Sequence, residues 1–444
     1  MDFDYKNYSK HGMYYANQFG AYRNVSIAEF SKLQKEYDKD GLLVDKALKE
    51  LKKRTTRDYY SKVYRAQTSA LTYSKKVFPT YKFIMPEALA DDWLSTVDWH
   101  KKFPTRDHSL HQTLTAYIVA KLLGNGHPRL AFSLPSGESL LDYCARQMLY
   151  EPKLEYWRMY ALSLGIDYKR LPFAVQEQWA RDVLYETAVV AALFHDMGYP
   201  WQYVNRLAKH IAVAEYGDSL NIVDDAIRTK ESIQNRLLIY PFYGYSDITM
   251  KHASPSLEKK VVRLIDRCLK DSHGLPGALG FMCLNDQIRK YSSAPRFSEA
   301  SYRLILDWAA VGIMMHDMKD LYWDDKNMKQ PQNPILRLSF DVDPLSSLIS
   351  MADVLEEFHR PCATFDCRNI DKVDLSYKFP CEGTRMYIRD GILYIIYRYK
   401  ETKDAAACKI RRQQEVNEYF NSRNGFVNLK SLGIKDVIGD TIDI

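Results

Sequence analysis

The sequence has no apolar run long enough to cross a membrane. Its longest purely apolar stretches, at residues 188–194 and 308–315, are about eight residues long, whereas a membrane-spanning helix needs roughly 20. The N-terminal segment MDFDYKNYSKHG is charged and aromatic, and it lacks the apolar core of a signal peptide. We therefore expect a soluble, cytoplasmic protein without a membrane partner.

The sequence also lacks paired cysteines and a strong charge bias. No CxxC pair occurs among the seven cysteines, which argues against a zinc finger, and their odd number and scattered spacing are typical of a reduced cytoplasmic protein. Lys and Arg total 62 against 56 for Asp and Glu, a net charge of +6. This mild excess suits an anionic substrate but falls short of the balance of a dedicated nucleic-acid binder.

The pattern of apolar residues predicts a mainly α protein with a β-containing end. Helical periodicity dominates the chain up to Pro361, after which the composition becomes β-branched and aromatic. Asp390-Gly391 lies between two such runs and predicts a hairpin, and a helix is expected over 409–423. We predict three parts: an N-terminal helical extension at 1–87, a helical domain at 88–361 with an insertion around 198–272, and a small β-hairpin and helix segment at 362–444.

A buried helix over residues 181–197 is predicted to end in a His-Asp pair. Counting back from His195 by four, seven and eleven residues reaches only apolar side chains, so His195 lies on the apolar face. Gly198 and Pro200 stop the helix directly after Asp196. An imidazole beside a carboxylate in such a place is costly unless the two are paired or bind a metal.

Four further polar residues interrupt or adjoin apolar segments. They are His111 in a predicted helix at 107–123, His316 in one at 302–318, Asp353 in one at 344–358, and His273 before another apolar run. Taken singly, each has an ordinary interpretation as a core or surface residue. Taken together, imidazole nitrogens and carboxylate oxygens on several rigid helices suit a preformed site for divalent first-row metals.

The order of these residues resembles that of HD-domain proteins, a superfamily of metal-dependent phosphohydrolases. Its members carry a His, then an adjacent His-Asp pair, then a distal Asp. The two-metal subgroup, which includes the HD-GYP phosphodiesterases, adds two histidines before that Asp. The whole set here is His111, His195, Asp196, His273, His316 and Asp353. The segments HQTLTAYIVAKLL, ALFHDMGYP, HGLPGALGF, WAAVGIMMHDM and DPLSSLISMADVLEEFHRP are similar to the family's own, over roughly residues 95–361.

The resemblance implies an HD-domain helical bundle with a binuclear metal site. Mn, Fe, Co, Ni or Zn would suit such His-rich ligands better than Mg. Asp196 would bridge the two ions, and a metal-activated hydroxide would attack phosphorus. One ion would be completed by His111, His195 and Asp353, and the other would be held by His273 and His316. His108, three residues earlier on the same helix, is the alternative to His111.

Some residues depart from the family pattern. Tyr199 stands where many relatives carry a lysine, so another cation would have to contact a substrate phosphate. Lys319 and Arg360 are the candidates; Lys319 has the alternative of a solvated side chain, and Arg360 that of capping a helix C-terminus. No GYP motif follows His316, and Asp317 makes a second His-Asp pair whose flanks fit the family less well.

These residues together predict a metal-dependent hydrolase of a small phosphorylated substrate. The resemblance implies a nucleotide, and a phosphomonoester, a cyclic or linear phosphodiester and a deoxynucleoside triphosphate all stay open. Two other functions stay open as well. One is an HD nuclease acting on single-stranded nucleic acid, which the modest charge disfavours. The other is a non-catalytic, nucleotide-binding regulatory HD protein. A homo-oligomer is compatible with every one of these functions.

Overall fold

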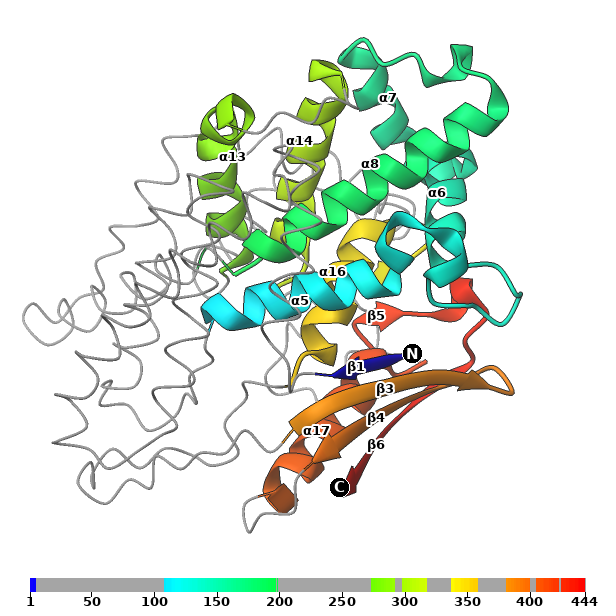
Figure 1. The fold of residues 1–444 in the computed structure, drawn as a ribbon, viewed down its shortest axis with the longest axis vertical. Helices are drawn as coiled ribbons and strands as arrows, with labels where there is room; N and C mark the ends of the chain where they lie inside the picture. The colour runs from blue at the N-terminus through cyan, green and yellow to red at the C-terminus, as the bar shows by residue number, and fades with distance from the viewer. Residues whose placement is uncertain are drawn as a thin grey trace, which may run out of the picture.

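The computed structural model describes residues 1–4, 108–196, 198, 273–291, 298–317, 337–357, 381–399, 405–422 and 425–443. The predicted helices over 26–76 and the predicted insertion lie outside these residues, apart from Gly198. Within them the chain is mostly helical, as the sequence predicts, with a small sheet at one end (Figure 1). None of the helices in the described ranges has the length and apolar character of a membrane span.

The longest described helix, α8 (Phe173–Phe194), runs through the centre of the helical part (Figure 1). It packs against α5 (His108–Leu122), α6 (Leu140–Tyr150), α14 (Glu299–Met315) and α16 (Pro344–Leu355). The two remaining helices are α7 (Glu155–Ser163) and α13 (Gly274–Tyr291), and both contact α14. The apolar residues of α8 from Ala180 onward are buried, because that half is enclosed by its neighbours.

Side-chain caps begin several of these helices. Ser139, Ser298 and Asp343 each accept a hydrogen bond from the backbone amide three residues on, at 3.0–3.1 Å. Such caps satisfy backbone donors that a helix start leaves without partners. Pro344 follows Asp343 at the first helical position, where its missing amide costs nothing.

Small residues on α14 let that helix approach its neighbours. A Cβ atom added to Gly312 would lie 3.0 Å from Leu345 of α16 and 3.4 Å from Ala191 of α8. A larger side chain would push these helices apart, so Gly312 brings together three helices whose ends carry the polar residues of interest.

The predicted hairpin is confirmed. Strands β3 (Cys381–Arg389) and β4 (Ile392–Tyr399) pair antiparallel, and Asp390 and Gly391 join them with φ values of 55° and 79°. Two left-handed residues in a two-residue loop form the turn that matches strand twist, which is why Asp-Gly is favoured there. The helix expected next is α17 (Ala405–Phe420), and it packs on the sheet.

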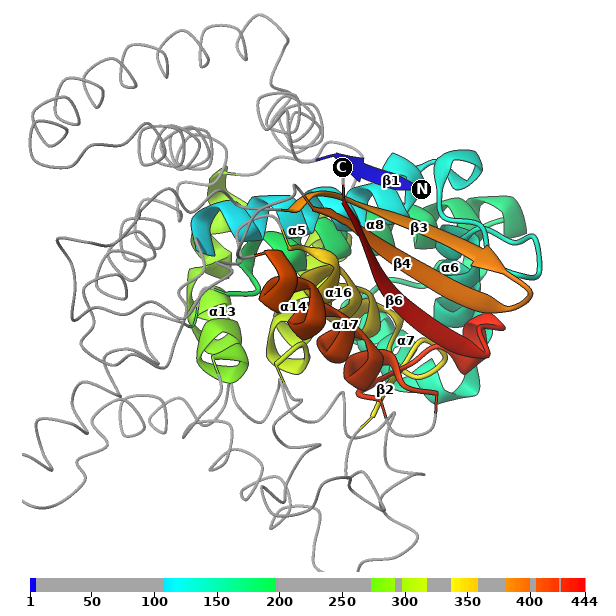
Figure 2. The same ribbon diagram turned by 90° about the horizontal axis from the view of Figure 1, so that it is seen from below.

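Two strands of this sheet were not predicted from the sequence. The order is β1-β3-β4-β6, with β6 (Asp436–Asp443) parallel to β4 and β1 (Asp2–Asp4) antiparallel to β3 (Figure 2). A two-stranded parallel pair, β2 (Leu338–Ser339) with β5 (Val427–Asn428), lies beside it. The sequence places residues 1–87 in a helical extension. Residues 2–4 instead form an edge strand of the sheet that the C-terminal part of the chain builds.

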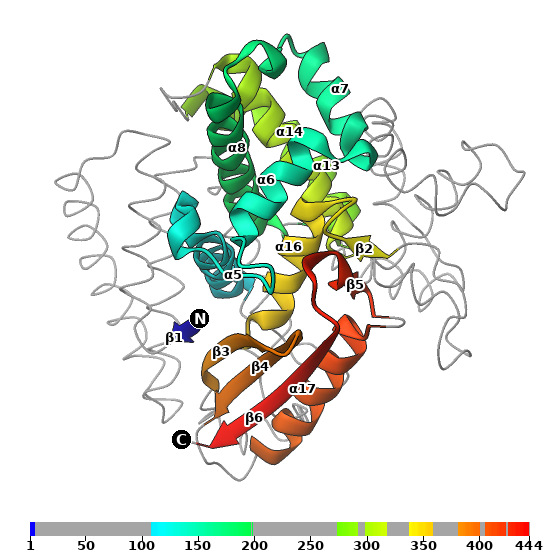
Figure 3. The ribbon, with the colours of Figure 1, turned by 90° about the vertical axis from the view of Figure 1, so that its right-hand side faces the viewer.

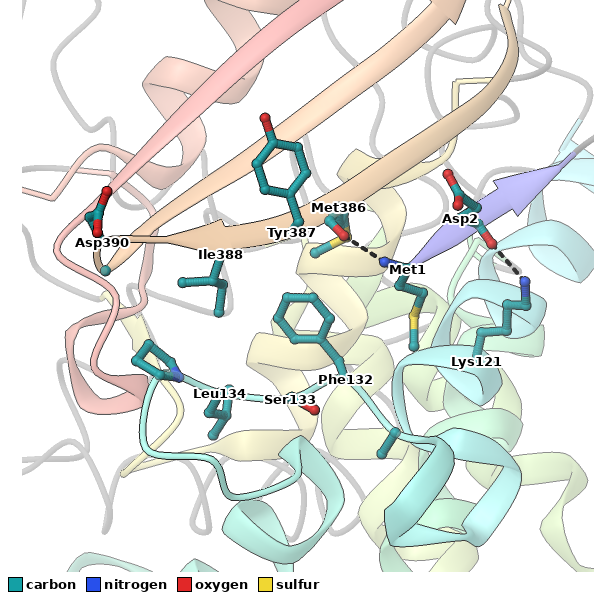
Figure 4. A pocket seen from close by; sticks show the side chains of 13 residues that line it. Met1, Asp2, Lys121, Phe132, Ser133, Leu134, Met386, Tyr387, Ile388 and Asp390 are labelled. Atoms are coloured by element: carbon teal, nitrogen blue, oxygen red, sulfur yellow. Dashed lines mark hydrogen bonds between the residues drawn. The ribbon is translucent and has the colours of Figure 1, made fainter.

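The chain start is held by polar contacts at both of its sides. The Met1 amino group donates to the Met386 carbonyl oxygen at 2.6 Å, and Lys121 of α5 donates to the Asp2 carbonyl oxygen at 2.6 Å (Figure 4). A hollow of about 900 Å³ lies beside these contacts, between β3 and the loop at 131–135. The start of the chain therefore bridges the sheet and α5, the helix that carries His111.

Candidate metal centre

Five helices bring the predicted ligands to one place. His111 lies in the first turn of α5, and Asp353 in the last turn of α16. The other ligands flank helix ends: His195 and Asp196 follow α8, His273 precedes α13, and His316 follows α14. All are buried except Asp353, whose side chain is 17% exposed. Because helix ends are fixed by packing, these side chains are held in place by rigid elements.

One half of the cluster joins α5, α8 and α16. His111 Nε2 lies 3.1 Å from His195 Nε2 and 3.0 Å from Asp353 Oδ1. His195 Nε2 lies 4.0 Å from the same Asp353 oxygen. These three side chains offer one ligand atom each, within 4.8 Å of one another, and could hold a metal ion.

The other half joins α13 and α14. His273 Nε2 lies 3.1 Å from His316 Nε2. Asp196 stands between the halves. Its Oδ1 is 3.0 Å from His273 Nε2 and 3.3 Å from His195 Nε2, and its Oδ2 is 3.6 Å from His111 Nε2. Its Oδ1 also lies 3.7 Å from His316 Nε2. A single carboxylate is thus surrounded by the Nε2 atoms of all four histidines.

The second group that could hold a metal differs from the predicted set. It consists of His195, Asp196 and His316, again with ligand atoms within 4.8 Å of one another. The sequence assigns His273 and His316 to the second ion and gives His195 to the first alone. In the structure His195 lies between the two groups, while His273 contacts Asp196 and His316 from one side.

Each histidine of the cluster directs its other ring nitrogen at an acceptor. His195 Nδ1 lies 2.7 Å from the Ala192 carbonyl oxygen, and His316 Nδ1 lies 2.6 Å from that of Ile313. Both are contacts to the residue three positions back in the preceding helix. Carbonyl oxygens only accept, so Nδ1 is the donor in each ring, and Nε2 is the nitrogen that faces the cluster.

Two carboxylates do the same for the remaining histidines. His111 Nδ1 lies 2.6 Å from Glu356 Oε2, and both side chains are fully buried. His273 Nδ1 lies 2.8 Å from Asp317 Oδ2, which also accepts from the His273 backbone amide at 2.8 Å. Carboxylate-histidine pairs of this kind fix the orientation and tautomer of a metal-ligating ring.

The charge of the cluster is uneven. Burial lowers the pKa of His195 to about 3, so this ring is neutral near pH 7, the form that binds a metal. Burial also opposes the charging of His273, but Asp317 and Asp196 outweigh it and raise the pKa of His273 to about 10. Without a metal, His273 therefore carries a proton on both nitrogens between two carboxylates.

Two residues of the site were missed by sequence reasoning. Asp317 was considered only as part of a competing His-Asp pair, whereas the structure uses both pairs at once. Glu356 belongs to the acidic run after Asp353 and lies just past the end of α16 with extended backbone angles, so only its nearness to Asp353 in the sequence could have pointed to it. The side chain of His108 and all of Tyr199, Lys319 and Arg360 lie outside the described residues.

Comparisons of the chain with protein-family models, with curated proteins and with solved structures found no match in any of the three. The fold and the site therefore define a class and not a family. The protein is mainly helical, and it holds a buried His and Asp cluster that could bind metal.

Proposed function

We propose that this protein is a metal-dependent phosphohydrolase with two divalent ions, acting on a small phosphorylated substrate. The observation that carries the proposal is the position of Asp196, a buried carboxylate with four Nε2 atoms within 3.7 Å of its oxygens. A carboxylate that can reach two ions, with histidines on either side, is the ligand arrangement of a binuclear centre.

The spacing of the rings supports a cation between them. In the His111–His195 pair the Nε2 atoms are 3.1 Å apart; the His273–His316 pair is equally close, but in the metal-free protein His273 Nε2 carries a proton. Two lone pairs at that distance repel unless a proton or a metal lies between them. Metal–nitrogen bonds of about 2.1 Å that meet near 90° end about 3.0 Å apart, and those that meet near 109° end about 3.4 Å apart. The observed spacing is nearer to the first value.

Mn, Fe, Co, Ni or Zn would suit this ligand set better than Mg, because imidazole dominates it. His111, His195 and Asp353 would hold one ion, and His273 and His316 the other, with Asp196 shared.

Bound divalent ions would supply a hydroxide near neutral pH and would neutralise charge on phosphoryl oxygens. The protein's own residues prepare for that chemistry. Glu356 and Asp317 hold the rings of His111 and His273, and burial keeps His195 neutral. Asp353 is the most exposed ligand, so substrate would approach from its side.

The substrate class follows from the resemblance to HD-domain proteins. We propose a nucleotide, as a phosphomonoester, a cyclic or linear phosphodiester or a deoxynucleoside triphosphate. Lys319 and Arg360 are the proposed cations for its phosphate, since both closely follow ligand-bearing helices in the sequence.

The test is phosphate release from a nucleotide panel with Mn²⁺, together with metal counting by mass spectrometry, on wild type and Asp196→Ala. The panel includes mono- and triphosphates, cyclic nucleotides and short oligonucleotides. We expect the wild type to bind two ions per chain and to release phosphate. Asp196→Ala should fold but lose the bound ions and the turnover. Turnover that survives in Asp196→Ala would refute the proposal. Metal binding without any turnover would favour a regulatory protein, and turnover of oligonucleotides alone would favour a nuclease.

A further inference from the structure

The C-terminal module, comprising β3, β4, α17, β5 and β6 at residues 381–399, 405–422 and 425–443, packs beside α16 (Figure 3). Asp353 lies in this helix and Glu356 directly follows it, and both contact His111. The contacts between the module and α16 therefore bear on the geometry of the metal centre.

The segment that leads into α16 is held by the module. Strand β2 pairs with β5, and the Leu338 amide donates to the Phe426 carbonyl oxygen at 2.9 Å. Arg337 donates to the carbonyl oxygens of Gly425 at 2.6 Å and Asn421 at 2.7 Å. Figure 3 shows β5 lying beside β2 at this end of α16. The helix start is thus anchored before its first turn.

The last turn of α16 is held by the module as well. The Val354 carbonyl oxygen accepts from Arg412 Nη1 at 2.9 Å and from the Tyr397 hydroxyl at 3.1 Å. The Leu355 carbonyl oxygen accepts from the Thr384 hydroxyl at 3.5 Å. Helix ends leave such carbonyls without intrahelical partners, and a buried carbonyl without any partner is destabilising.

The chain leaves α16 with two glutamates that face opposite ways. Glu356 has extended backbone angles, and successive side chains in extended chain point in opposite directions. Glu356 contacts His111 in the cluster, whereas Glu357 forms a buried ion pair with Arg412 in the module. Tyr399 also donates to Glu357, at 3.0 Å. A shift of Glu357 would therefore move Glu356.

We infer that Arg412 is a positioning residue of the metal centre. One side chain, fully buried on α17, holds both the Val354 carbonyl oxygen and the Glu357 carboxylate. Val354 directly follows Asp353, and Glu357 directly follows Glu356. Arg412 therefore holds the segment that presents the carboxylates of Asp353 and Glu356 to His111. The inference rests on the proposed function, because it concerns the ion held by His111, His195 and Asp353.

The test uses Co²⁺ alone as the probe, titrated into the full-length chain stripped of metal. Visible absorption reports ligand geometry, and equilibrium dialysis reports the number of ions. Arg412→Lys keeps the positive charge beside Glu357 but lacks the planar fork that reaches two acceptors. The matched control is Val416→Ala, a buried residue one turn further along the same helix, which lies against Gly439 of β6. Thermal unfolding of all variants is measured in parallel.

Arg412→Lys should weaken one of two Co²⁺ affinities by about tenfold, as is usual for residues behind the ligands, and should alter the absorption spectrum. Val416→Ala should lose stability but keep both affinities and the spectrum. If Arg412→Lys does not fold, Tyr399→Phe removes a single bond to Glu357 and should give a smaller change of the same kind. Unchanged binding in the folded variants would overturn the inference. A wild type that binds no metal would instead refute the proposed function.

Discussion

The contact between Glu356 and His111 gives the sharpest test of how the site is ordered. The two groups are 2.6 Å apart and fully buried, so neither has water as an alternative partner. Glu356→Gln keeps the shape and an accepting oxygen but removes the charge. A hydrogen bond to a charged group contributes about 1.5–3 kcal/mol against about 1 kcal/mol for a neutral one. The variant should therefore lose roughly 0.5–2 kcal/mol of orientation energy at His111.

That loss corresponds to roughly 2–30-fold weaker metal binding, and its upper part overlaps the range of about 10–100-fold typical of residues that orient ligands. The assay is Co²⁺ titration of the metal-free variant. The control is Asp343→Asn, which removes a fully buried charge from the other end of α16 but retains a good helix cap. Equal Co²⁺ affinity in Glu356→Gln and wild type would show that this carboxylate does not tune His111. Equal loss in both variants would show a general effect on α16.

Two further outcomes follow from the other half of the site. Replacing His273 and His316 together with alanine should remove about one metal per chain, and an unchanged metal count would show a mononuclear site. In the metal-free protein, protonated His273 stabilises the fold because its pKa is raised from 6.5 to about 10. This stabilisation is complete below pH 6.5 and is lost as the pH rises toward about 10. The lowered pKa of His195 acts the other way, so stability is lost below pH 6.5 toward about 3. Urea unfolding in the presence of a chelator should therefore give a maximum near pH 6.5, and a monotonic rise toward alkaline pH would contradict this.

The sequence predicted helices well where one face is apolar. The segments at 181–197, 302–318 and 344–358 correspond to α8, α14 and α16. The start of α8 was placed too late, because the helix begins at Phe173 with a largely exposed part in which apolar residues such as Phe173 and Val175 face solvent. Strand β1 could not be predicted at all, since three residues carry no pattern and their partner strand lies some 380 positions away.

The candidate ligands were easier to find in the sequence than the residues that orient them. Ligands interrupt apolar helices, so a polar residue such as His195 stands out against its neighbours. Residues that orient ligands are instead polar groups among other polar groups, like Glu356 beside Glu357. Their roles depend on which way each side chain faces where the helix ends. The backbone decides this locally, and composition does not reveal it.

The two His-Asp pairs show this limit most clearly. His195-Asp196 and His316-Asp317 each follow a buried helix, and in each the histidine Nδ1 faces a carbonyl oxygen three residues back. Their aspartates nevertheless do different work: Asp196 contacts the Nε2 side of the rings, whereas Asp317 contacts Nδ1 of His273 and the backbone at the start of α13. The difference arises because α13 begins beside Asp317, where the backbone amides of His273 and Gly274 donate to its carboxylate. Equivalent dipeptides thus place one carboxylate at the centre of the cluster and the other behind a histidine ring, according to the helix that each one meets.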